Sequence, residues 1–162
     1  MRPLILVLAW SVLLLAGSAR ADWSYTDEVD PMTSKKVFYA TTDSVNSLSL
    51  ESPYAGRKYG HLTVRLQDGA NNVYVEIDKG QFVGCVTGCP IMIRFDERPP
   101  VRFQGRGPAD YSGTTVFVLP AGQFISLAKG AKMIRFQANI YKAGAPVLEF
   151  QANALTWPPA KK

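Results

Sequence analysis

A regular alternation of apolar and polar residues runs through most of this chain and constrains its fold more than any other feature. Every second residue is apolar between His61 and Gln67, and again between Asn72 and Asp78. Successive side chains of a β-strand point to opposite faces, so this period of two predicts strands with one buried face. The sequence "DGANN" at 68–72 has the residues of a tight turn. The two segments are therefore expected to form an antiparallel hairpin.

The alternation recurs along the rest of the chain, with Gly, Pro, Asn and Asp between the alternating segments. The further predicted strands are 36–42, 45–50, 81–85, 91–95, 101–104, 114–119, 133–141 and 146–152. The stretch 121–130 breaks the pattern, because its apolar residues recur at helical spacing and Gly130 is suited to end a helix. We therefore predict an all-β protein, an antiparallel β-sandwich or flattened barrel of about nine to ten strands with one short helix at about 121–130.

The first 21 residues have the pattern of a secretory signal peptide. Arg2 precedes an apolar stretch from Leu4 to Leu15, and Ala19-Arg20-Ala21 has the form of a cleavage site. The apolar stretch is shorter than the roughly 20 residues that a membrane-spanning helix needs. We therefore expect a periplasmic or secreted protein without stable membrane insertion, organised as a signal peptide at 1–21, a single domain at 22–158 and a basic tail at 159–162.

The charge of the chain is mildly positive and gives little indication of the partner. The formal net charge is +5 for the full sequence. Two of the basic residues, Arg2 and Arg20, belong to the predicted signal peptide, and Lys161 and Lys162 to the tail. Domains that bind nucleic acid concentrate a strong basic excess on one face. Nucleic acid is therefore not an expected partner of this chain.

Both cysteines of the chain lie in "GCVTGC" at 84–89. Cysteines this close together usually pair in the oxidising compartments where exported proteins fold. We therefore expect a Cys85–Cys89 disulfide across a tight connection between two strands. Closing so short a loop contributes about 2 kcal/mol on a chain-entropy basis.

The alternative for this segment is a metal or redox centre. The pattern C-x-x-x-C-P resembles the copper-binding motif of the chaperones that assemble cytochrome oxidase. The resemblance implies Cu(I) held by Cys85, Cys89 and the single histidine, His61. Thiol exchange at the two cysteines is a further alternative. In those chaperones the motif leads into a helix of a thioredoxin-like fold, whereas here the β-patterned "IMIRF" follows it. This difference favours the structural disulfide.

Catalytic motifs are not evident in the sequence. One histidine without acidic neighbours in the sequence gives little support for a nucleophilic triad or a zinc site. The acidic residues Glu76 and Asp78, and likewise Asp96 and Glu97, fit solvated strand edges and turns. We therefore expect a non-enzymatic binding or accessory protein without a cofactor, which contacts another envelope or secreted protein.

Arginines at outward positions of the predicted strands form a candidate binding face. Guanidinium groups bind carboxylates and phosphates through two parallel hydrogen bonds, so strands placed side by side would present an anion-binding surface. The alternative is an ordinary charged face that is balanced by acidic residues such as Glu76, Asp96 and Glu149. The arginines of the candidate face are Arg65, Arg94, Arg102 and Arg135.

The order of features along the chain resembles that of a group of small exported proteobacterial proteins of unknown function. The features are Trp23, "DPMTSKK" at 30–36, "HLTVRL" at 61–66, "CPIMIRFD" at 89–96 and "VLEFQANALTW" at 147–157. Because these motifs are structural, the resemblance implies a β-fold and carries no activity.

Two characterised families share parts of this layout. Accessory proteins associated with type VI secretion resemble the chain at Trp23, Asp30, Met32, Thr33 and Ala154-Leu155. The invasion-associated locus B family resembles it at Cys85, Gly88, Cys89, Leu127 and Gly130, although the cysteine spacing here is shorter than is usual in that family. Both resemblances concern architecture, and fold alone does not fix function.

Overall fold

The computed structural model describes residues 22–158, so the predicted signal peptide at 1–21 and the basic tail at 159–162 lie outside the described residues. It confirms the all-β prediction, with one short helix, α1 (Ala121–Ala128), in the predicted place. The strands are β1 (Ser24–Val29), β2 (Lys36–Asp43), β3 (Leu48–Leu50), β4 (Gly56–Lys58), β5 (Gly60–Gln67), β6 (Ala70–Ile77), β7 (Cys89–Phe95), β8 (Val101–Arg106), β9 (Thr115–Leu119), β10 (Met133–Gln137) and β11 (Val147–Gln151).

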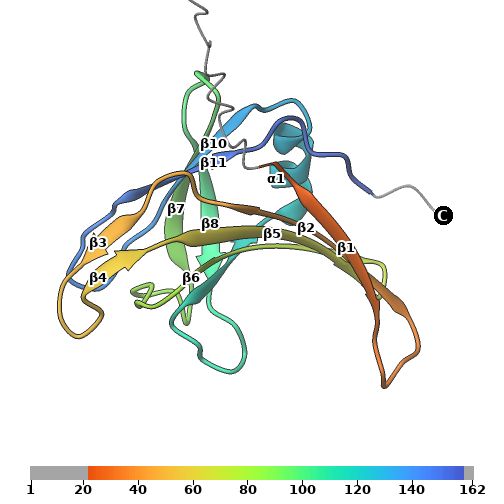
Figure 1. Ribbon diagram of the computed structural model, residues 1–162, viewed down its shortest axis with the longest axis horizontal. Helices are drawn as coiled ribbons and strands as arrows, with labels where there is room; N and C mark the ends of the chain where they lie inside the picture. Colours follow the sequence, from red (N-terminus) through yellow and green to blue (C-terminus); the bar gives the residue numbers. More distant parts are fainter. Residues whose placement is uncertain (1–21, 159–162) are drawn as a thin grey trace, which may run out of the picture.

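Nine of the strands form one antiparallel sheet in the order β1-β2-β5-β6-β9-β8-β7-β10-β11, and β3 and β4 form a separate pair. The large sheet curls, so that β11 returns to the end of β2 (Figure 1). Ser44 forms a single bridge with Phe150, and the Val45 N–H donates to the Glu149 carbonyl at 2.8 Å. The predicted sandwich or flattened barrel is therefore realised as one curled sheet that is not closed into a barrel.

The core lies on the inner face of this sheet, as the alternation predicts. Val73, Val75 and Ile77 of β6 are at most 1% exposed, while the residues between them reach the outer face. Helix α1 packs against β6 and β9 and buries Phe124 in edge-to-face contact with two phenylalanines of β7 and β8. The helix therefore covers part of the inner face that the strands alone leave open.

The β5–β6 hairpin confirms the turn predicted at 68–72. Asp68 and Gly69 both have positive φ, at 50° and 76°, and they separate the paired residues Gln67 and Ala70. A two-residue turn with positive φ at both positions matches the right-handed twist of the flanking strands, and Asp-Gly is a preferred sequence for it. This hairpin sets the register of two central strands.

One of the predicted strands is absent from the structure, and two are longer than the strands that form there. The segment 81–85 is not a strand, because the N–H groups of Phe82 and Val83 bond to two different segments and Gly84 turns the backbone at φ 77°. Within 45–50 only β3 pairs as a strand, because the residues before it bond to β11 instead. Within 133–141, β10 ends at Gln137. In these segments, the apolar alternation predicts which residues are buried, but the backbone does not form the regular hydrogen bonds of a paired strand.

Two strands, β1 and β4, lie outside the segments predicted from the sequence. All six residues of β1 are exposed, so the strand carries no alternation and is held to β2 through its backbone. The strand β4 has only three residues, which is too short for a period to be recognised. Both lie at the periphery of the fold, and β1 is an edge strand of the large sheet.

The predicted Cys85–Cys89 disulfide is present, and it ties the loop before β7 to the first residue of that strand. Both cysteines are buried, and Cys89 pairs across the sheet with Gly105 of β8. A Cβ atom at position 105 would lie 2.6 Å from the Cys89 sulfur and 2.7 Å from the Ile91 side chain. Glycine is therefore required where the disulfide packs onto β8.

Replacing Gly105 with alanine is expected to destabilise the fold by about 1–3 kcal/mol, because the added methyl group overpacks the disulfide and Ile91. Thermal or urea unfolding measures the change. Gly122→Ala is the matched control, since the position is helical and the added methyl group meets nothing within 4 Å apart from its chain neighbours and the backbone of its own helix. Equal stability of the Gly105→Ala variant and the wild type would contradict this account.

Candidate functional site

Three of the four predicted arginines lie on neighbouring strands of the outer face. Arg94 of β7 is the register partner of Arg135 on β10, and Arg102 of β8 lies opposite Met92 of β7. Arg65 is on β5, which β6 and β9 separate from β8. The structure therefore brings Arg94, Arg102 and Arg135 together and places Arg65 apart from them.

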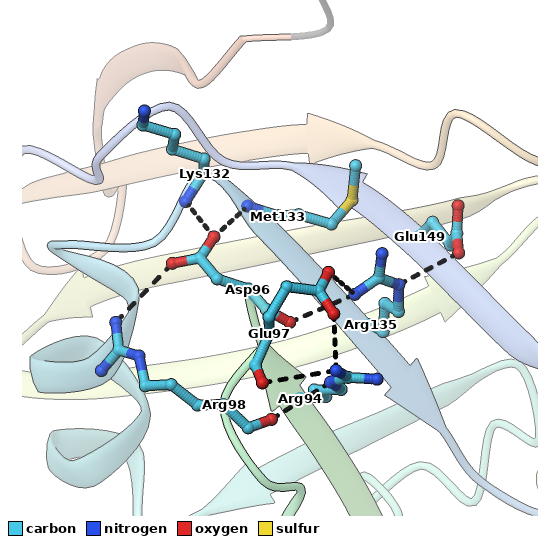
Figure 2. Close-up of polar contacts among 8 residues, drawn as sticks. All are labelled: Arg94, Asp96, Glu97, Arg98, Lys132, Met133, Arg135 and Glu149. Atoms are coloured by element: carbon cyan, nitrogen blue, oxygen red, sulfur yellow. Dashed lines mark hydrogen bonds and ion pairs between the residues drawn. The ribbon is translucent and has the colours of Figure 1, made fainter.

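The chain's own groups already bind two of these arginines (Figure 2). The Arg94 guanidinium donates to the Glu97 carboxylate at 2.6 Å and to the Arg98 carbonyl at 3.1 Å. The Arg135 guanidinium donates to the other Glu97 oxygen at 3.3 Å and to Glu149 at 3.2 Å. Glu97 thus bridges both arginines. This part of the face fits the alternative of a charged surface that is balanced internally.

Asp96 holds the β7–β8 turn in place beside this cluster. One of its carboxylate oxygens accepts the N–H groups of Lys132 and Met133 at 2.7 and 2.9 Å, and the other pairs with Arg98 at 3.7 Å. Desolvation acts to raise the pKa of Asp96, but the two N–H donors and Arg98 outweigh it, and the pKa is lowered. The carboxylate is therefore ionised near neutral pH and fixes Glu97 over the two arginines.

Arg65 has a separate environment on the opposite part of the sheet. Its guanidinium donates to the Asn72 side chain at 2.9 Å and lies 5.8 Å from the centre of the Tyr74 ring. The ring of Tyr74 in turn packs against Phe117 of β9 at 5.4 Å. Arg65 therefore stabilises the packing of β5, β6 and β9 on the outer face.

Arg102 and Arg106 differ from these arginines, because within residues 22–158 neither forms an ion pair or a side-chain hydrogen bond. Both are exposed on β8, with the exposed Gln104 between them. The predicted strand covers only 101–104, whereas β8 extends to Arg106 and sets Arg102, Gln104 and Arg106 on one face. The alternation in "VRFQGR" was the signal for this arrangement.

Two hollows adjoin these arginines. The larger, about 540 Å³, is lined by Gly88-Cys89-Pro90, Arg102 and Gln104 together with Leu119. The smaller, about 240 Å³, is lined by Arg106, Phe117 and the same Leu119. Leu119 is 37% exposed and forms the wall that the hollows share.

The smaller hollow has a clear structural origin. Pairing between β6 and β9 covers only Tyr74–Glu76 on β6, and the first residues of β6 pair with β5 alone. On the N-terminal side of Tyr74, β6 therefore separates from β9. This leaves a depression that Asn71 and Asn72 border. The outer face of β8 and β9 thus carries two cationic side chains beside two hollows, an arrangement suited to an anionic ligand with side chains of its own.

The surroundings of His61 are not predictable from its neighbours in the sequence. The ring Nδ1 lies 2.7 Å from the Asp43 carboxylate, and the ring Nε2 lies 3.1 Å from the Asp78 carboxylate. Both carboxylates are acceptors when ionised, so both bonds form only when both ring nitrogens carry a proton. The aspartates come from the end of β2 and from just after β6, which is why they are distant from His61 in the sequence. This geometry requires the imidazolium form.

The pKa of His61 follows from the same contacts. Burial acts to lower the pKa, but the hydrogen bonds to Asp43 and Asp78 outweigh it, and the pKa is raised. The pKa of Asp78 is lowered, first by the Tyr59 N–H and then by His61. The hydrogen-bonded cluster of His61, Asp43 and Asp78 therefore ties together β2, β5 and the end of β6.

The ligands of the copper alternative are not assembled in the structure. Cys85 and Cys89 are bonded to each other, and His61 is engaged by two aspartates. Within residues 22–158, no group of three or more His, Cys, Asp or Glu side chains is arranged to hold a metal ion. In the same residues, no helix has the length and apolar character needed to cross a membrane.

Comparison with known proteins supports a resemblance at the level of the fold. The chain matches no family model, and no curated protein is significantly similar to it. The crystal structure of invasion associated protein b from Bartonella henselae matches with a TM-score of 0.51 at 17% sequence identity, over 83% of this chain and 87% of that one. The architectural resemblance to the invasion-associated locus B family is thus supported. The resemblances to type VI secretion accessory proteins and to the proteobacterial group stay predictions.

The titration of His61 is the prediction that follows from its two carboxylate contacts. It is the single histidine of the chain, so its ring resonances in an NMR titration are assigned without ambiguity. We expect a midpoint above the ordinary value of about 6.5, and a lower midpoint in the Asp78→Asn variant. A midpoint at or below the ordinary value in the wild type would contradict the imidazolium assignment.

The same contacts make stability depend on pH. Because the folded pKa of His61 is raised, its contribution to stability is fully present below about pH 6.5 and is lost as the pH rises through the folded pKa. The Asp78 contribution has the opposite sign, since its lowered pKa makes it present above about pH 4 and lost in acid. In thermal unfolding, the wild type is expected to lose stability as the pH rises from about 6.5 through the folded pKa of His61. A His61→Gln variant is expected to lack this decrease.

Proposed function

We propose that this chain is an exported binding or accessory protein of the bacterial cell envelope, which acts by contact with another protein and without catalysis. The contact surface is the outer face of β8 and β9, defined by Arg102, Gln104, Arg106, Phe117 and Leu119 and called here the β8–β9 face. The protein is periplasmic or secreted in this proposal.

The observation that carries the proposal is the pair of unneutralised arginines on the β8–β9 face. On the neighbouring strands, the guanidinium groups of Arg94 and Arg135 are held by Glu97 and Glu149, which belong to the chain itself. Arg102 and Arg106 lack such partners within residues 22–158, and each borders a hollow. Exposed arginines beside depressions that can accept side chains are common anchors of protein interfaces.

Three further observations support an exported protein that does not act as an enzyme. A disulfide is typical of proteins that fold outside the cytosol. The structural resemblance is to a protein named for its association with invasion. His61 has both ring nitrogens engaged by carboxylates, which leaves the imidazolium without a free site to act as a general base.

The proposal is tested by reversing the charge of the β8–β9 face. The double variant Arg102→Glu/Arg106→Glu is expected to reduce capture of the envelope partner by tenfold or more, because each lost charge-assisted bond is worth about 1.5–3 kcal/mol. Chemical cross-linking in intact cells, followed by purification of the tagged chain, measures the capture. Thermal unfolding checks that both replaced side chains, which are exposed, leave the fold intact.

Arg57→Glu is the matched control for this experiment. Arg57 is exposed on β4, in the separate two-stranded sheet, and its replacement changes the net charge without touching the β8–β9 face. Its capture of the partner is expected to equal that of the wild type. Unchanged capture by the double variant, or an equal loss in the control, would refute the proposed surface.

A further inference from the structure

We propose that the β8–β9 face binds an extended acidic segment of its partner, with two carboxylates four residues apart and an apolar side chain between them. One carboxylate binds Arg102, the other binds Arg106, and the intervening segment crosses Leu119. This inference rests on the proposed function and specifies the chemistry of the ligand.

The spacing of the two arginines sets the spacing of the carboxylates. Arg102 and Arg106 are four residues apart on one strand and point to the same face. A strand rises about 3.3 Å per residue, so the two positions are separated by roughly 13 Å. An extended partner segment has the same rise per residue and the same alternation of faces. It therefore meets both arginines when its carboxylates are also four residues apart.

The surface between the arginines sets the character of the central residue. Gln104 lies midway on β8 and is paired across the sheet with Leu119 of β9. Leu119 is among the exposed large hydrophobic residues of the chain and separates the two hollows. An apolar side chain at the middle of the partner segment covers Leu119, while the two acidic residues lie toward the hollows on either side.

The nearby carboxylates leave these arginines free for a ligand. Glu97 binds Arg94 and Arg135, and Glu149 binds Arg135 as well. Asp96 is occupied by two backbone N–H groups and Arg98. The positive charge at Arg102 and Arg106 is therefore complementary to an acidic ligand, whereas the charge at Arg94 and Arg135 is already neutralised.

Binding of synthetic peptides to the purified exported protein tests this inference. The probe is a fluorescently labelled nine-residue peptide of threonine and valine with aspartates at positions 3 and 7 and leucine at position 5. Fluorescence anisotropy measures its Kd. Replacing both aspartates with asparagine is expected to weaken binding by tenfold or more, and moving the aspartates to positions 3 and 4 is expected to weaken it about as much.

Protein variants locate the probe on the molecule. Arg102→Gln and Arg106→Gln are each expected to raise the Kd about tenfold, while Arg57→Gln leaves it unchanged. Leu119→Ser is expected to weaken binding of the leucine peptide more than that of a peptide with serine at position 5. Equal binding of the aspartate and asparagine peptides, absence of binding, or an equal effect of Arg57→Gln would overturn the inference.

Vesicles with and without anionic phospholipid distinguish a protein ligand from a lipid surface. Vesicle binding that depends on Arg102 and Arg106, with no binding of the probe, would assign the face to lipid headgroups and overturn the inference. Failure of this inference can be distinguished from failure of the proposed function. If the aspartate probe fails but capture of the envelope protein still requires Arg102 and Arg106, the inference fails and the proposed function stands.

Discussion

Hydrogen bonds join β11, at one end of the large sheet, to residues 44–46, which follow β2. The Val45 N–H donates to Glu149, and the Asn46 side chain bonds to the backbone of Val147 and Glu149. These bonds cover the edge of β11 and hold the curl of the sheet. Because the curl encloses the inner face, the apolar side of the central strands is buried and their polar side is turned outward, whereas all six residues of β1 are exposed. The polar character of the outer face is thus a direct consequence of these hydrogen bonds.

The charges on the outer face then divide into neutralised and available groups. Glu97 lies at the turn after β7, so its carboxylate reaches the arginines of two neighbouring strands. The turn itself is held by Asp96, which binds the backbone at the start of β10. Within residues 22–158, no carboxylate forms an ion pair with Arg102 or Arg106 of β8. Arg102 and Arg106 are consequently the arginines that we propose form the contact surface.

The sequence predicted the elements whose signals are local and missed those that depend on distant contacts. The β5–β6 hairpin, α1 and the Cys85–Cys89 disulfide follow from alternation, helical spacing and a short cysteine separation. The carboxylates around His61 were not foreseen, because Asp43 and Asp78 meet it only through the pairing of β2, β5 and β6. The candidate arginines were identified by their outward positions. Which of them are neutralised depends on Glu97 and Glu149, whose placement requires the three-dimensional fold.

Photo-cross-linking from the β8–β9 face in intact cells tests whether Arg102 and Arg106 form the contact surface. A photoreactive amino acid replaces the exposed Gln104, and the same residue at the exposed Arg57 serves as the reference position. The account predicts a covalent adduct with one envelope protein from position 104 and none from position 57, with the adduct from position 104 lost when Arg102 and Arg106 are also replaced by glutamate. An adduct from position 57 alone, or one from position 104 that persists after the charge reversal, would contradict it.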